Sequence, residues 1–583
     1  MSNSTEILNF IRRSSHEFTT FQNLILLETD KEKSHEELII TQINNELKKK
    51  NSCVNGLKII HYILPRISDE NLLKYGLLWI TKSIQILGSI ENNISDLTFT
   101  CQTLADLVVL CKNKPELHKQ ISMQNVKQIL VILNNLSEKE RCGGVYYLIA
   151  VLLFHYAEVC ERHQDTIMKM ILPQIDSNEV NLATAGANCF ALITKALERS
   201  FKPPTKFVNY NNWVYSQVLL CNSLHLIINQ LFSDVSEFIF IDKMDFEDYE
   251  LLDLPKISED NILEYYNGLE RRFVNLNIYL STMLRGCGEK NSVSPTDILH
   301  LLCKGLAITP FNLKSQTSVE TILLSMLPRL HVSLLTTTCA FIQGFKQELI
   351  PFSDSILKLI QQTLEWTEKM TTNQSISNQD ESFKTVRLFA YKTLNAWLTY
   401  TGSVTVIETF TNCFLPLIIK DIKGLSTSDL TVSVQNQHEN NSFRAFNQGL
   451  HTLQFNTDAC EEALLSLQNI LLSANCWLNS SSYELIKNQI VCVLQDLYLD
   501  SSLSKVLKLK ANFRLQLLKT MEVMQMNFHP LTPPPTQFSA EIFNMALIDT
   551  DVNVIQEAKF GVSKLEKIIH PGAPTLNLPF TSN

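Results

Sequence analysis

The chain has 583 residues, of which 45% are hydrophobic and 19% are charged, and its formal net charge is −9. This apolar content excludes disorder over the whole chain, and the length requires several cores or one continuous array of repeats. The acidic balance gives no overall positive field for phosphate backbones, so nucleic-acid binding is not the first expectation.

Helical periodicity dominates the N-terminal third. Apolar residues recur every three or four positions, first at Leu73, Leu77, Ile80, Ile84 and Leu87, then at Leu104, Leu107, Val108 and Cys111. This is the spacing of helices that bury one face. The apolar run at 145–154 has about half of the ~20 residues that a membrane span needs. We interpret it as a helix buried on all sides of a soluble protein.

The same pattern continues to the C-terminal end in the segments 323–330, 389–397, 464–472 and 515–518. The best strand candidate, "LTVSV" at 430–434, lies in a polar stretch. Most helices should span about 12 to 20 residues between brief polar breaks, which suits stacked helix pairs better than one bundle. The sequence therefore predicts an all-α fold, an α-solenoid of HEAT/armadillo-like repeats.

Prolines and small residues refine this prediction. A Leu-Pro step occurs at 64–65, 172–173, 327–328 and 415–416, where it should end or bend a helix. The segments 176–193 and 549–565 share an acidic turn, a valine and small residues at helical spacing, which lets neighbouring helices approach closely. The tryptophans mostly lie on apolar stripes, so we expect them in the core.

Composition shifts suggest the following organisation. We expect an N-terminal helical segment (1–52), a first repeat region (53–240), an acidic loop (241–260), middle repeats (261–424), a flexible polar insertion (425–457), C-terminal repeats (458–568) and a frayed tail (569–583).

The acidic loop is the one candidate partner-binding segment. It holds eight acidic and two basic residues, with large apolar side chains between them. Such a segment can fold onto a basic, apolar groove of another protein, with charge steering the encounter. The alternative is a solvated loop between repeats. The candidate binding residues are Asp242, Asp245, Phe246, Glu247, Asp248 and Tyr249.

Motifs for catalysis, cofactors or metals are not found. The sequence has no glycine-rich phosphate loop, no G-x-S-x-G elbow and no H-E-x-x-H helix. The 14 cysteines include no C-x-x-C pair, which favours reduced, buried thiols inside the cell. We therefore expect a protein that is not an enzyme, binds no cofactor or metal and, lacking an apolar leader, is not secreted.

Six segments resemble, in the same order, the proline-, glutamate- and leucine-rich nuclear protein (PELP) family, the counterparts of the Rix pre-rRNA-processing subunit. The most recognisable is "PELHKQISMQNVKQIL" (115–130). The others are "GLLWITKSIQIL" (76–87), "ILHLLCKGLAIT" (298–309), "SMLPRLHVSLLTTTCAFIQGF" (325–345), "TVRLFAYKTLNAWLTYTG" (385–402) and "DACEEALLSLQNILLS" (458–473).

The resemblance implies a non-catalytic α-solenoid scaffold of the rixosome in the nucleolus and nucleoplasm, acting in 60S pre-ribosome maturation and ITS2 processing. Its implied partners are a WD-repeat subunit, a second helical-repeat subunit, a Las-type endonuclease and its kinase, a SUMO protease, the AAA-ATPase midasin and pre-60S particles. A homodimer and direct RNA contact stay open, and no membrane is expected.

The sequence departs from the vertebrate pattern in two respects. A long proline- and glutamate-rich tail is not seen, and the nearest approaches to an L-x-x-L-L box begin with Ile149 and Ile298. Receptor coactivation and histone binding are therefore not carried over. The alternatives are a karyopherin-like nuclear transport adaptor, which should bind Ran-GTP, another helical-repeat scaffold, and an enzyme with a hidden site.

Overall fold

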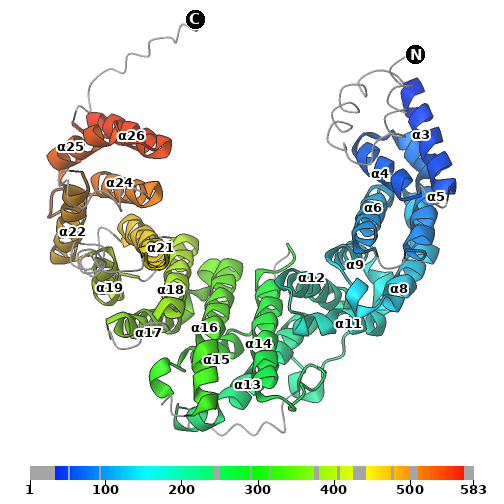
Figure 1. The fold of residues 1–583 in the computed structure, drawn as a ribbon, viewed down its shortest axis with the longest axis horizontal. Helices are drawn as coiled ribbons and strands as arrows, with labels where there is room; N and C mark the ends of the chain where they lie inside the picture. Colours follow the sequence, from blue (N-terminus) through cyan, green and yellow to red (C-terminus); the bar gives the residue numbers. More distant parts are fainter. Residues whose placement is uncertain are drawn as a thin grey trace, which may run out of the picture. The chain divides into compact units, whose positions relative to one another are not determined.

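The computed structural model describes residues 33–49, 53–90, 93–239, 250–288, 292–313, 317–372, 380–402, 407–423, 442–474, 478–498 and 510–569. Nearly all of these residues lie in helices (Figure 1). Within these ranges, a single bridge between His529 and Thr532 is the only strand-type pairing. The predicted all-α class is confirmed, while the strand candidate at 430–434 lies outside the described residues.

The helices divide between two compact units. The first comprises Met1–Leu220, Glu250–Ile257 and Ile278–Val293, and the second comprises Cys221–Tyr249, Ser258–Asn277 and Ser294–Asn583. Two long helices, α13 (Asn212–Ile239) and α14 (Ile262–Arg285), contribute residues to both units.

The first unit is a two-layered stack of helix pairs. One layer contains α4 (Cys53–Ile63), α6 (Ile94–Lys112), α9 (Gly143–His155) and α12 (Val180–Ala196), each packed on the next. The other layer contains α3 (Lys33–Lys48), α5 (Asp69–Leu87), α7 (Pro115–Gln120), the π-helical turn η2 (Ile121–Asn125), α8 (Val126–Asn135), α10 (Ala157–Glu161) and α11 (Gln164–Ile171). This alternation of layers is the arrangement of a helical-repeat solenoid.

Small residues set the spacing inside the first unit. A Cβ atom at Gly144 would lie 2.8 Å from the Thr98 Cα atom, so glycine permits the close contact of α9 with α6. A Cβ atom at Gly186 of α12 would collide with the hydroxyl group of Tyr279. The prediction that small residues in segment 176–193 permit close helix packing is therefore confirmed.

Tryptophans anchor the stacks, as predicted. Trp79 is fully buried, and its indole Nε1 donates a 3.0 Å hydrogen bond to Asn44 Oδ1 of the preceding pair. Trp213, Trp366 and Trp397 are also buried. The fifth tryptophan, Trp477, lies outside the described residues.

The second unit repeats the two-layer plan. One layer runs through α16 (Ser318–Phe345), α18 (Asp380–Thr401), α21 (Ser442–Ala474), α24 (Ala511–Met526) and α26 (Val552–Ile569). The other runs through α15 (Pro295–Leu306), α17 (Ser353–Thr372), α19 (Thr411–Lys423), α22 (Ser480–Tyr498) and α25 (Thr536–Ala546). The described helices of both units therefore form α-solenoid stacks, as predicted.

Buried amide side chains tie successive helices of the first of these layers together. Asn395 Nδ2 on α18 donates to the Glu462 carbonyl oxygen on α21 at 3.0 Å. Gln468 Nε2 on α21 donates to the Gln516 carbonyl oxygen and to Thr520 Oγ1 on α24, both at 3.0 Å. A buried amide group that loses its hydrogen-bond partners destabilises the folded protein. These contacts therefore fix the register of the helices as well as holding the layer together.

The Leu-Pro steps have two outcomes. Leu64-Pro65 and Leu172-Pro173 begin 3₁₀ turns directly after α4 and α11, as expected for helix ends. Pro328 and Pro416 lie inside α16 and α19. The expected upper length of about 20 residues is wrong for α13, α14, α16, α18 and α21, which have 28, 24, 28, 22 and 33 residues. In α16 the helix continues past Pro328, and α21 begins early at Ser442.

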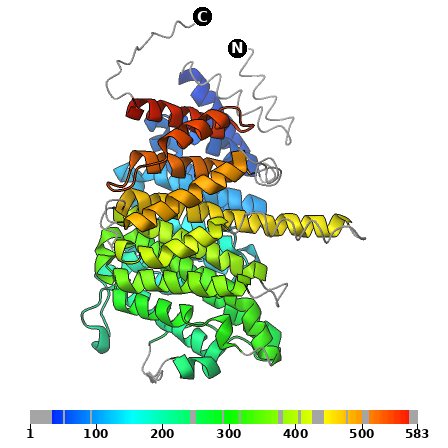
Figure 2. The same ribbon diagram turned by 90° about the vertical axis from the view of Figure 1, so that its left-hand side faces the viewer.

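The polar insertion predicted at 425–457 needs a correction. Residues 442–457 begin α21, whose first half extends past the neighbouring helices of its unit in Figure 2. Ser, Asn and Gln residues are compatible with a helix, so a polar composition did not exclude one. Residues 424–441 lie outside the described residues.

Among the described residues, three helical stretches are long and apolar enough to cross a membrane by length and composition alone: Ile94–Lys112, Val180–Arg199 and Ser318–Met370. Within the structure, 50%, 44% and 67% of their most apolar windows are buried. Their hydropathy is thus accounted for by packing against neighbouring helices in both layers, as expected for helices central to a stack.

Candidate functional site

The predicted acidic binding segment is described only in its second half. The six candidate residues Asp242, Asp245, Phe246, Glu247, Asp248 and Tyr249 lie outside the described residues. Residues 250–257 belong to the first unit, with Leu252, Leu254 and Ile257 half-buried. The Tyr215 hydroxyl donates to Glu250, and burial together with this carboxylate raises the pKa of Tyr215 to about 12. Residues 250–257 are therefore packed on the first unit, whereas 258–260 are exposed.

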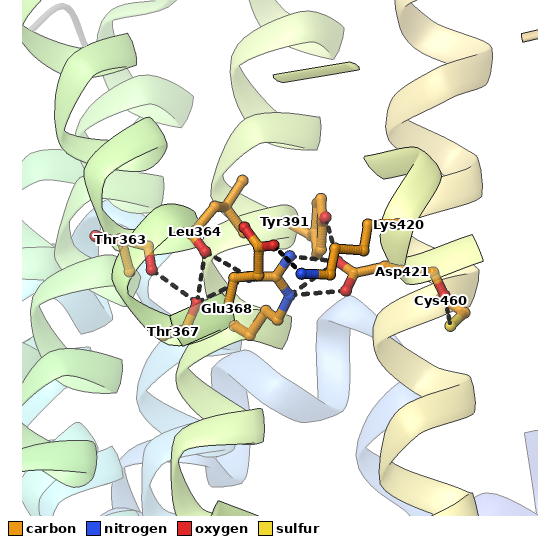
Figure 3. Close-up of polar contacts among 9 residues, drawn as sticks. Thr363, Leu364, Thr367, Glu368, Tyr391, Lys420, Asp421 and Cys460 are labelled. Atoms are coloured by element: carbon orange, nitrogen blue, oxygen red, sulfur yellow. Dashed lines mark hydrogen bonds and ion pairs between the residues drawn. The ribbon is translucent and has the colours of Figure 1, made fainter. Parts of the chain in front are cut away.

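A buried ionic cluster is the most elaborate polar site in the second unit. Its centre is Arg387 on α18, whose side chain is 4% exposed. Figure 3 shows its partners Thr367 and Asp421 close together. Arg387 Nε donates to both carboxylate oxygens of Asp421 on α19, at 2.8 and 3.0 Å. Arg387 Nη1 donates to the Leu364 carbonyl oxygen and, at 3.0 Å, to Thr367 Oγ1 on α17. One guanidinium group thus joins three helices.

Tyr391 and Cys460 complete this cluster. The Tyr391 hydroxyl donates to Asp421 Oδ2, and the Cys460 thiol donates to the Asp421 carbonyl oxygen at 3.0 Å. Burial is the main reason why the pKa of Tyr391 and the pKa of Cys460 are raised well above their ordinary values, and the Asp421 charge adds to it. A neutral phenol and a neutral thiol are poor nucleophiles, so the cluster is suited to holding helices together.

The same arrangement recurs near the C-terminal end of the second unit. Arg514 on α24 donates from Nε and Nη2 to the carboxylate of Asp549, at 2.8 and 2.7 Å, and both side chains are buried. Asp421 lies in the last turn of α19, and Asp549 lies in the turn that follows α25, so each arginine of one layer reaches an aspartate in or just after the next helix of the other layer. We call these two contacts the arginine clamps. They link consecutive repeats of the solenoid.

Sequence reasoning missed both clamp arginines. The available signal was a charge inside an otherwise apolar stripe, at Val386-Arg387-Leu388 and Phe513-Arg514. A buried arginine needs a carboxylate partner, and the partners lie 34 and 35 residues further along the chain. The acidic turn noted at 549–551 supplies one of them.

A pair of histidines in the second unit offers no catalytic geometry. The rings of His225 on α13 and His300 on α15 lie 4.9 Å apart, and burial lowers the pKa of His225 to about 3. Lys304 Nζ beside them donates to Asn229 Oδ1 at 2.6 Å. Among the described residues, no carboxylate forms a hydrogen bond or ion pair with either imidazole, as the orienting group of a general base would.

The described ranges offer no clear site for metal binding or for thiol chemistry. No three His, Cys, Asp or Glu side chains gather there as a group that could hold a metal ion. Burial raises the pKa of Cys111 and of Cys160 to about 12, which keeps these thiols protonated. A hollow of about 570 Å³ at the start of α25 is lined by Pro534, Pro535, Thr536, Gln537, Phe538 and Glu541. Glu541 is the one carboxylate among these lining residues.

Comparison with known proteins identifies related sequences. Residues 14–182 match the model of the RIX1 family, described as acting in rRNA processing and ribosome biogenesis. The chain is 22% identical over 561 residues to proline-, glutamic acid- and leucine-rich protein 1 of Xenopus laevis. The aligned region covers 93% of this chain and 54% of that protein, so the chain spans about half the length of this relative.

Solved structures give only distant likenesses. An engineered protein aligns with 97% of this chain and 99% of its own at 10% identity, with a TM-score of 0.26. Importin beta aligns with 96% of this chain and 76% of its own at 8% identity, with a TM-score of 0.29. Both scores are low, and the fold assignment rests on the helix contacts described above.

Proposed function

We propose that this chain is a member of the family of RIX1 and proline-, glutamic acid- and leucine-rich proteins, and that it acts in rRNA processing and ribosome biogenesis. The match of residues 14–182 carries this proposal. The similarity to the Xenopus laevis protein extends the resemblance over 93% of the chain.

Within that process, we propose a scaffold without chemistry of its own. Two features support this role: the stacked helices present long outer faces, and the buried polar groups described above serve to join helices. A solenoid of this kind can hold several proteins at fixed separations, which raises their effective concentration toward one another. The expected location is the nucleus, in nucleoli and nucleoplasm.

The proposed step is maturation of the large ribosomal subunit, including ITS2 processing. The proposed partners are a WD-repeat subunit, a second helical-repeat subunit, a Las-type endonuclease with its kinase, a SUMO protease, a midasin-type ATPase and pre-60S particles.

The experiment is affinity purification of the tagged full chain followed by mass spectrometry. We expect WD-repeat and Las-type proteins in stoichiometric amounts, and we expect depletion of the chain to cause ITS2-containing precursors to accumulate. Recovery of Ran-GTP without ribosomal precursors would instead favour a nuclear transport adaptor. Turnover of a substrate by the purified chain alone would contradict the non-catalytic role.

A further inference from the structure

Helix α21 has two halves with different surroundings. Its second half packs on α18, α19 and α24 of the same unit. The side chains that this half buries include Cys460, Leu464, Leu467 and Leu471. Its first half, residues 442–457, extends past these neighbours, as Figure 2 shows. One continuous helix therefore passes from a packed environment into a stretch without neighbouring helices of its unit.

The apolar stripe of the packed half continues into the projecting half. Along α21, apolar residues recur at alternating intervals of three and four positions, and only Thr457 interrupts the series. In the projecting half the series consists of Phe443, Phe446, Leu450 and Leu453, which we call the projecting stripe. Such a seven-residue repeat is the spacing of a helix that packs along its length against another helix.

The projecting half has little besides this stripe to keep it helical. Isolated helices of this length are marginal in water, and Gly449 lowers the helix propensity further. Arg444 is the only residue of 442–457 with a fixed charge, so ion pairs one turn apart cannot support this half from within. Its helical state therefore depends on burial of the projecting stripe.

We propose that the projecting stripe binds one amphipathic helix of a partner protein, whose own apolar residues recur at the same seven-residue spacing. The occupant is a helix because helices already cover the continuation of this stripe in the second half of α21. A second copy would bring another Arg444 and no carboxylate within residues 442–457, so charge complementarity favours a different protein. This inference rests on the proposed scaffold function, because it identifies one surface through which a scaffold would hold a partner.

The first test identifies the occupant by cross-linking. The tagged full chain carries the photoreactive residue p-benzoylphenylalanine in place of Phe446, Leu450 or Leu453, and mass spectrometry identifies the cross-linked peptide in the purified complex. We expect the three positions to cross-link to successive turns of one segment of one partner, whose apolar residues recur at intervals of three and four. The same probe at Gln448, on the opposite side of the helix by its spacing, should not cross-link to that segment.

The second test removes the middle of the projecting stripe. The double variant Phe446→Ser/Leu450→Ser should lower recovery of the cross-linked partner about tenfold or more, in high salt as well as in low salt, because apolar contacts are not screened by ions. The matched control Gln448→Ser/Thr452→Ser, on the other side of the helix, should leave recovery unchanged. Circular dichroism should show that both variants keep the helix content of the stack.

Amide hydrogen exchange distinguishes an open stripe from one that is covered within the chain. Residues 443–453 should exchange rapidly in the purified chain and slowly in the complex. The proposal is overturned if they exchange equally slowly in the chain alone, or if the control variant lowers recovery as much as the stripe variant does.

The cross-links can also overturn the proposal. They do so if none forms at the three stripe positions, if they fall on a second copy of the chain, or if the cross-linked segment lacks the apolar spacing. If ribosome-assembly factors still co-purify with the chain in any of these cases, the projecting stripe is overturned and the proposed function stands.

Discussion

Replacing Asp421 by alanine would leave the guanidinium group of Arg387 buried without its carboxylate. Arg387 is 4% exposed and Asp421 is 19% exposed, so solvent cannot replace the lost partner fully. Removing one member of a buried pair costs about 3–5 kcal/mol, and we expect a value near 3 because Asp421 is partly solvated. The free energy of unfolding, obtained by guanidinium chloride denaturation followed by circular dichroism, measures this loss.

The neighbouring residue provides a matched control. Lys420 pairs with Glu368 beside the same cluster (Figure 3), but its side chain is 53% exposed. A solvated pair contributes about 0–1 kcal/mol, so Lys420→Ala should change the unfolding free energy little.

A double variant tests the reasoning directly. Arg387→Met/Asp421→Leu removes both charges and fills the space with apolar atoms, so it should recover most of the stability lost in Asp421→Ala. Equal losses for Asp421→Ala and Lys420→Ala, or no recovery in the double variant, would refute the claim that an uncompensated charge causes the loss.

Three further predictions concern other contacts. Gly186→Ala should destabilise the first unit by about 1–3 kcal/mol in thermal denaturation, because the added methyl group meets Tyr279, whereas Gly143→Ala, with no atom within 4 Å, should not. Burial and a hydrogen bond to a second carboxyl group raise the pKa of Glu557 to about 7. The folded state therefore binds more protons than the unfolded state, and stability should fall as the pH rises from about 4.5 through 7. Glu557→Gln should flatten this dependence in denaturation experiments at pH 5.5 and 8.5, and an unchanged slope would contradict the assignment. Gln468→Leu should cost about 1–2 kcal/mol and speed hydrogen exchange in α21 and α24, and unchanged exchange there would argue against the register role.

The helices were predictable because their signal is local. The stripe from Leu73 to Leu87 lies inside α5 (Asp69–Leu87), and the apolar run at 145–154 lies inside α9 (Gly143–His155). One turn of helix brings residues three or four positions apart onto one face, so the sequence reveals the helix and most of its buried face. Ile80, Ile84 and Leu87 are buried as the stripe predicts, whereas Leu73 is 45% exposed. The beginning of α21 at Ser442 was missed because polar residues dominate its first half, although Phe443, Phe446, Leu450 and Leu453 recur there at helical spacing.

The polar sites were less predictable because their partners are distant in sequence. Arg387 meets Asp421 only after two helices have stacked, and Gln468 meets Thr520 only across α21 and α24. The π-helical turn at 121–125 was equally hidden: its residues read as parts of two ordinary short helices, and the extra residue per turn appears only in the backbone hydrogen bonding. The predicted candidates at 242–249 lie outside the described residues, so that interpretation stays a prediction.

The arginine clamps determine where the chain can be truncated to give smaller stable fragments. A fragment ending before Asp549 would keep α24 but leave the Arg514 guanidinium group in an apolar interior without its carboxylate partner. A fragment ending between α18 and α19 would do the same to Arg387. Truncation after a seemingly complete helix pair would therefore yield aggregating material, whereas a boundary placed after α26 leaves every clamp closed.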